Sequence, residues 1–278
     1  MRISRLRHAA YEPDRLPSTT QPPTENRTGR RARGFAVASL ALAAALTASA
    51  CGSSAQADDD GRIAVVSSTA VWGDIAEQVG GDAVNVTTIV PDGADPHDFQ
   101  VSPTDALEVS DAQLLITNGG GYDGFFQPLV DGSGSSADIV DAFSLSDTDR
   151  GLGPVRAADD DNEHVWFDLN TVDAVAATVA DRLAELDPEG AADFHANADA
   201  LHAKLQELAQ QADEIAAAGP GPVVSTEPVA HYLLERAGIA DETPPDFGEA
   251  VEQGSDPAPA TLAELRTLLA GDTISALV

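Results

Sequence analysis

Residues 187–222 read DPEGAADFHANADALHAKLQELAQQADEIAAAGPGP, and this stretch decides the fold. Apolar side chains recur every three or four positions from Phe194 to Ile215, which is the spacing of one buried helix face. A helix over 188–217 would be about 45 Å long, which is more than one small domain needs. We therefore predict a rigid connecting helix over residues 188–218 that joins two lobes, with a coiled-coil seam as the alternative. Asp187 is predicted to cap it, because Pro188 suits a first helical position.

Strand and helix patterns alternate on both sides of this helix. Before it, strands are predicted over 63–66, 84–90, 113–117 and 138–140, and helices over 71–79, 103–109, 122–130 and 171–185. After it come a strand over 223–226, helices over 230–237 and 262–269, and a strand that starts at residue 273. Such alternation is typical of α/β proteins with mainly parallel sheets. We predict an N-terminal α/β lobe over 62–187 and a partial C-terminal α/β lobe over 219–278, which we expect to be incomplete because the sequence stops inside a strand.

The N-terminal segment resembles a secretion signal. The apolar run FAVASLALAAALTASA over residues 35–50 follows an arginine cluster and is shorter than the about 20 residues that a bilayer span needs. It ends in small residues directly before Cys51, as in the lipobox of bacterial lipoproteins. We predict a signal peptide over 1–50, a lipid on Cys51, a tether over 51–61 and a location on the extracytoplasmic face of the cell membrane. An uncleaved N-terminal anchor is the alternative, and it leaves the protein on the same side.

The charge of the chain excludes some classes of partner. It has 46 acidic and 15 basic residues, a formal net charge of -31. A surface this acidic repels nucleic acid, so we expect no nucleic-acid partner. With a single cysteine the chain forms no internal disulfide.

Two histidines and one carboxylate are candidate metal ligands, and two of the three, His97 and Glu227, lie where an α/β sheet places ligand-binding residues. His97 lies in the loop VPDGADPHDFQVSP (90–103) after a strand, and Glu227 directly follows the strand in VVSTEPVAHYLL (223–234). His164 lies in EHVWFDLN (163–170), ahead of a helix. Ligands bind at the carboxyl ends of strands in open α/β sheets, and imidazole with carboxylate suits Zn²⁺, Mn²⁺ or Fe²⁺. These residues are too far apart in the sequence to form a local motif, so spacing alone leaves an exposed loop histidine as the alternative for His97.

These segments, together with DPEGAADFHANADAL, resemble in order the zinc and manganese substrate-binding lipoproteins of bacterial ABC importers, solute-binding protein family 9. The resemblance covers nearly all of residues 62–278. It implies two α/β lobes joined by one rigid helix, with a divalent metal ion as cargo in the cleft between them. It also implies His97, His164 and Glu227 as metal ligands, an ABC permease as partner, a monomer and no catalysis. The fourth ligand of the family, usually acidic, lies beyond Val278, so we assign none.

The sequence leaves alternatives for the metal and for the function. The carboxylate of Glu227 favours Mn²⁺ or Fe²⁺ more than imidazole does, whereas affinity generally rises from Mn²⁺ to Zn²⁺. His231 is four positions from Glu227 and is a further candidate ligand, and the acidic run 159–161 is either a cation-gathering loop or a solvated one. A metal-dependent surface hydrolase and a lipid-anchored adhesin or binder of another solute are the alternative functions. The chain has no H-E-x-x-H helix and no G-x-S-x-G elbow to support a hydrolase.

Overall fold

The computed structural model describes residues 61–158 and 160–278, and all of these belong to one compact unit. The strands are β1 (Ile63–Ser67), β2 (Val84–Thr88), β3 (Leu114–Thr117), β4 (Asp138–Asp141), β5 (Val223–Val224) and β6 (Ala276–Leu277). The helices are α1 (Ala70–Gly80), α2 (Pro103–Asp111), α3 (Phe126–Ser133), α4 (Leu169–Leu186), α5 (Ala191–Ala217), α6 (His231–Arg236), α7 (Pro245–Glu252) and α8 (Pro259–Leu269). Short 3-10 turns include η3 (Val165–Phe167) and η4 (Pro228–Ala230).

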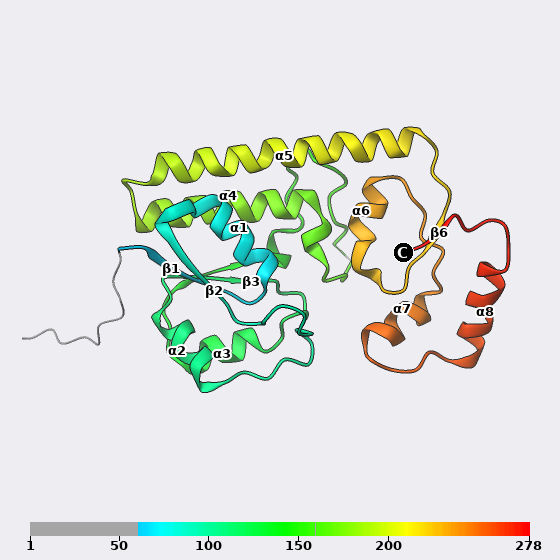
Figure 1. Cartoon of the computed structure of the whole chain (residues 1–278), viewed down its shortest axis with the longest axis horizontal. Coiled ribbons are helices and arrows are strands. Elements are labelled where there is room, and N and C mark those ends of the chain that lie inside the picture. Colours follow the sequence, from blue (N-terminus) through cyan, green and yellow to red (C-terminus); the bar gives the residue numbers. More distant parts are fainter. Residues whose placement is uncertain (1–60, 159) are drawn as a thin grey trace, which may run out of the picture. The chain divides into compact units, whose positions relative to one another are not determined.

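Four strands form a parallel sheet in the order β2-β1-β3-β4 (Figure 1). Each strand returns to the sheet through a helix, as parallel pairing requires. The α/β class predicted from the alternating patterns is confirmed. Neighbouring residues of β1 point to opposite faces, so Val65 belongs to one apolar cluster and Val66 to another.

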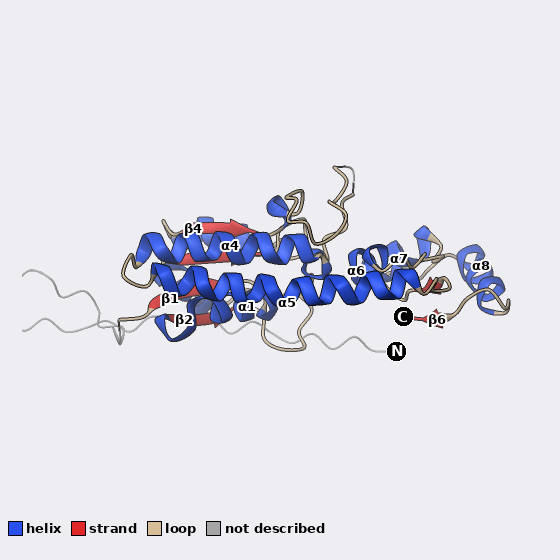
Figure 2. Ribbon diagram, turned by 90° about the horizontal axis from the view of Figure 1, so that it is seen from above, coloured by secondary structure: helices blue, strands red, loops and turns tan. Residues whose placement is uncertain are grey.

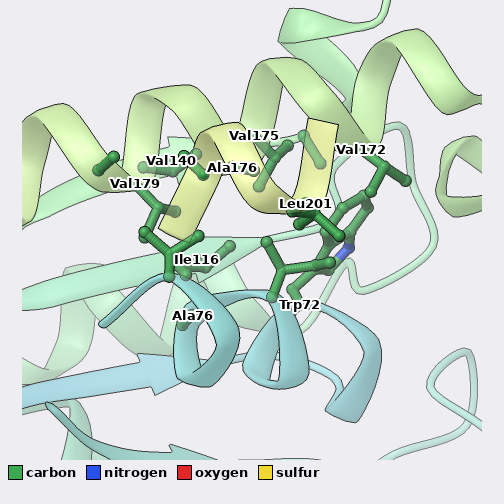
Figure 3. Packing of buried hydrophobic residues seen from close by; sticks show 14 of the residues in the cluster. Trp72, Ala76, Ile116, Val140, Val172, Val175, Ala176, Val179 and Leu201 are labelled. Carbon is green, nitrogen blue, oxygen red and sulfur yellow. The ribbon is translucent and has the colours of Figure 1, made fainter. Parts of the chain in front are cut away.

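The larger cluster fills the space between this sheet and the helices α1, α4 and α5. Figure 3 shows Trp72 and Ala76 of α1 packed beneath Val175 and Val179 of α4, with Ile116 of β3 beside them. The indole Nε1 of Trp72 donates a hydrogen bond of 3.0 Å to Asn118, so this fully buried ring leaves no polar atom unpaired. The other face of the sheet is covered by α2 and α3.

Helix α5 runs past α4 and α1 and reaches α6 (Figure 1, Figure 2). Its buried residues include Phe194, Leu201 and Leu205, which follow the predicted spacing. It begins at Ala191, three residues later than predicted, and Asp187 is not its cap. Asp187 instead closes α4, donating its backbone N–H to the carbonyl of Leu183 at 2.8 Å.

Residues 219–278 form a smaller region with its own two-stranded parallel sheet, in which β5 pairs with β6. The predicted strands over 223–226 and from 273 shrink to two residues each, and α7 was not predicted at all. Few apolar side chains of this region are buried. Its buried apolar residues are Val223, Val224, Tyr232, Leu234 and Ala237, and Tyr232 packs with the large cluster of the first region.

Within residues 61–158 and 160–278, no helix has both the length and the apolar composition needed to cross a bilayer. The predicted signal peptide and Cys51 lie outside the described residues. The division into two lobes stays a prediction.

Candidate metal centre

Three segments that are distant in the sequence bring His97, His164 and Glu227 to one cleft of about 850 Å³. His97 lies in the loop after β2, His164 immediately precedes η3, and Glu227 lies between β5 and η4. His97 and Glu227 thus follow strands, as the sequence predicted for ligand-binding residues.

His97 is held beside a carboxylate that the sequence analysis did not nominate. Its backbone N–H donates to Asp95 Oδ1 at 2.9 Å, which shapes the loop. Its Nε2 lies 3.1 Å from Oε1 of Glu163, and its ring packs edge-on against Tyr122 with centroids 5.0 Å apart. One third of the His97 side chain remains exposed, so the imidazole is accessible from the cleft.

His164 is buried, with only 4% of the residue exposed. Its Nδ1 lies 2.9 Å from Oδ1 of Asn162 and 3.6 Å from Oε1 of Glu252. Burial, and secondarily the electrostatic effect of the neighbouring His97, lowers the pKa of His164 to about 4. The ring is therefore neutral near pH 7, which is the state in which imidazole binds a metal.

Glu227 is exposed and lies on the rim shared by this cleft and a neighbouring cavity of about 680 Å³. Its charge is one of the causes that raise the pKa values of Tyr122 and Glu252. Glu227 is not among the most tightly grouped donors. Among the described residues, the donor atoms that lie within 4.8 Å of one another belong to Glu163, His164 and Glu252.

Glu163 and Glu252 are the two site residues that the sequence analysis missed. Burial is the main cause that raises the pKa of each carboxyl, with His97 opposing the rise in both. Glu163 could have been found from its position next to His164. Glu252 carried no usable signal, because it ends the unpredicted helix α7.

Aromatic rings form one wall of the cleft. Tyr122 packs against His164 at 5.8 Å and against Trp166 at 4.6 Å between ring centroids. Burial, followed by the charges of Asp95 and Glu163, raises the pKa of Tyr122 to about 12, so its hydroxyl stays protonated. The wall can orient imidazoles, and its Tyr122 hydroxyl can donate a hydrogen bond, but it offers no negative charge.

The remaining candidates lie to the side of the cleft. His231 lines only the neighbouring cavity, and its Nε2 is 3.4 Å from Oδ2 of Asp160. His231 is therefore not brought together with His97 and His164. Asp161 also lines that cavity, whereas residue 159 lies outside the described part of the chain.

The family and the relatives that resemble this chain are metal-uptake and metal-binding proteins by name. The model of a family described as "Zinc-uptake complex component A periplasmic" matches residues 65–278. The manganese-binding lipoprotein MntA of Halalkalibacterium halodurans is 35% identical over 166 residues, which cover 59% of this chain and 54% of that protein. The chain thus spans little more than half the length of the curated relatives it matches.

Solved structures support the fold. A structure titled "Crystal structure of ZnuA" superposes with a TM-score of 0.62 at 23% identity, covering 74% of this chain and 77% of that one. A manganese-bound mutant of the periplasmic metal binding protein from candidatus liberibacter asiaticus gives a TM-score of 0.62 at 22% identity, covering 78% and 79%. The resemblance stated from the sequence motifs is confirmed, and none of these relatives supports the hydrolase or the adhesin alternative.

Proposed function

This chain belongs to the family of periplasmic zinc-uptake component A proteins, and from that premise we propose that it captures a divalent transition-metal ion and delivers it to an ABC importer. The observation that carries the proposal is the single cleft lined by His97, His164 and Glu227. We propose that the first region, residues 62–187, and the second region, residues 219–278, act as the two lobes around this cleft, joined by residues 188–218. The ion is cargo, and the chain itself carries out no catalysis.

The proposed ligands are the imidazoles of His97 and His164 and the carboxylate of Glu227. A neutral imidazole is required for binding, and the low pKa of His164 supplies it at neutral pH. Glu163 and Glu252 place further carboxylate oxygens within reach of the same donors. Two nitrogen donors and as many as three carboxylates make a donor set suited to Mn²⁺ as well as to Zn²⁺.

Manganese and zinc are the two proposed cargoes. Oxygen-rich donor sets reduce the usual advantage of Zn²⁺ over Mn²⁺, because carboxylate oxygen is a harder donor than imidazole nitrogen. The manganese-binding name of the relative from Halalkalibacterium halodurans agrees with this chemistry. We expect Zn²⁺ to bind more tightly in direct competition and Mn²⁺ to be taken up where it is more abundant.

The permease and the membrane are the proposed partners. A lipid on Cys51 would hold the chain at the extracytoplasmic face, where the ion is captured, and the chain would act as a monomer. The relatives named as ABC transporter substrate-binding lipoproteins support this arrangement.

Elemental analysis and competitive titration of the full chain with Mn²⁺ and Zn²⁺ test the proposal. We expect one tightly bound ion per chain. His97→Ala and Glu227→Ala should each lower affinity by more than about 100-fold, because even residues behind metal ligands are worth 10- to 100-fold. His195→Ala is the matched control, since His195 lies on α5 with half of its side chain exposed.

Two results would count against the proposal. A folded chain that binds neither ion would show that the cleft is not a metal site. Binding that survives both His97→Ala and Glu227→Ala would place the ion elsewhere.

A further inference from the structure

The side chain of Asn162 contacts both the His164 segment and the Glu227 segment. Its Nδ2 donates a hydrogen bond of 3.0 Å to the backbone carbonyl of Pro228. Its Oδ1 accepts the backbone N–H of His164 at 2.9 Å. A donor bond and an acceptor bond at opposite ends of the carboxamide fix which end is oxygen.

That orientation decides where His164 carries its proton. Oδ1 of Asn162 also lies 2.9 Å from Nδ1 of the ring, and Oε1 of Glu252 lies 3.6 Å from the same nitrogen. The amide oxygen of Asn162 accepts and cannot donate, whereas 3.6 Å is too long for a hydrogen bond to Glu252, so the proton sits on Nδ1. Nε2 then keeps its lone pair, and no described residue forms a hydrogen bond with it.

The same residue fixes the segment that carries the other proposed ligand. Pro228 directly follows Glu227, so the hydrogen bond to its carbonyl restrains the turn in which Glu227 lies. The hydroxyl of Tyr232 donates to the backbone carbonyl of Asn162 at 2.5 Å. Tyr232 is buried, and burial raises its pKa above the ordinary range, so it remains a donor.

We propose that Asn162 is a positioning residue of the metal site: it holds the proton on Nδ1 of His164 so that Nε2 is free for the ion, and it ties the Glu227 turn to His164. The inference rests on the proposed function for its metal-binding consequence. The position of the proton on His164 follows from the hydrogen bonds alone.

Two variants separate the two roles. Asn162→Ala removes all three hydrogen bonds of the side chain, two to His164 and one to Pro228. Asn162→Asp keeps an acceptor for Nδ1 but loses the donor to Pro228. Asn197→Ala is the control, because Asn197 also donates a hydrogen bond to a backbone carbonyl, that of Val79, but does not line the cleft.

The experiment is a long-range ¹H–¹⁵N spectrum of the metal-free full chain with labelled histidine, together with Mn²⁺ titration of each variant. Wild type and Asn197→Ala should show His164 with the proton on Nδ1. Asn162→Asp should keep that tautomer and lose less affinity than Asn162→Ala. Asn162→Ala should show a mixture of tautomers and an affinity lower by about 10- to 100-fold.

A pure Nδ1–H tautomer in Asn162→Ala, or an Mn²⁺ affinity within about threefold of wild type, would overturn the inference. Loss of the tautomer in Asn162→Asp would do the same, and this variant decides the matter if Asn162→Ala does not fold. If the wild type binds no Mn²⁺ or Zn²⁺, the proposed function fails, while the tautomer spectra still decide the role of Asn162.

Discussion

Acidification should destabilise the metal-free protein through His164. The folded pKa of this histidine is about 4, below the 6.5 of a free imidazole, because the ring is buried. Between these two values the unfolded chain binds a proton that the folded chain does not. The stabilisation from keeping His164 neutral is therefore complete above pH 6.5 and is lost as pH falls towards 4.

The size of the effect follows from the two pKa values. At ~1.36 kcal/mol per unit, moving from about pH 7.5 to about pH 4.5 lowers the free energy of unfolding by about 2.5 kcal/mol. Glu163 and Glu252 act in the opposite direction, because their raised pKa values let the folded chain take up protons early. The contribution of His164 must therefore be isolated by comparison with a variant.

Urea unfolding of the wild type and of His164→Gln, both in the presence of a chelator, provides that comparison. On going from about pH 7.5 to about pH 4.5, the wild type should lose about 2.5 kcal/mol more of its free energy of unfolding than His164→Gln loses. His195→Gln, with its half-exposed side chain, should follow the wild type at both pH values. A difference between wild type and His164→Gln that does not change with pH would refute the reasoning.

Three further outcomes are expected. In urea unfolding, Gly80→Ala should lower the free energy of unfolding by about 1–3 kcal/mol, because a Cβ there would collide with the side chain of Val84. Gly132→Ala is the control: it lies on an open helix surface and should be neutral or stabilising by up to about 1 kcal/mol. Arg236→Ala should cost about 2 kcal/mol in thermal or urea unfolding, because its guanidinium makes three hydrogen bonds that tie α6 to α5 and to the loop before α4. Glu252→Gln should weaken binding of Mn²⁺ more than of Zn²⁺ in a competitive titration, because a neutral amide oxygen replaces an anionic carboxylate oxygen. An equal loss for both ions would contradict that role.

The larger sheet could be predicted from the sequence because its central strands β1 and β3 are buried and short, and because turn residues separate the strands. Val65 and Leu115 belong to near-continuous apolar runs of the kind that parallel sheets require. The end of α5 followed from Gly219, whereas its start did not. Asp187 was available to two helices, and the sequence does not say which of them it closes.

The candidate site was only partly predictable, because its residues are joined by tertiary contacts. His97 and Glu227 follow strands, which is a local signal. Asn162 donates a hydrogen bond to Pro228, and no pattern in the sequence links the two positions. Glu252 ends a helix that begins at two prolines and contains Gly248, so no apolar periodicity indicated it.

The sparse apolar interior of residues 219–278 bears on how long cargo stays bound. Segments with few buried apolar contacts open at low free energy while the rest of a protein remains folded. Glu227 belongs to this region, whereas His97 and His164 belong to the part with the large core. Local opening would remove one proposed ligand and break the hydrogen bond from Asn162 to Pro228, and the first sheet would stay intact. We expect opening of this region to limit the residence time of the ion, so a change that slows amide hydrogen exchange in β5 should also slow metal release.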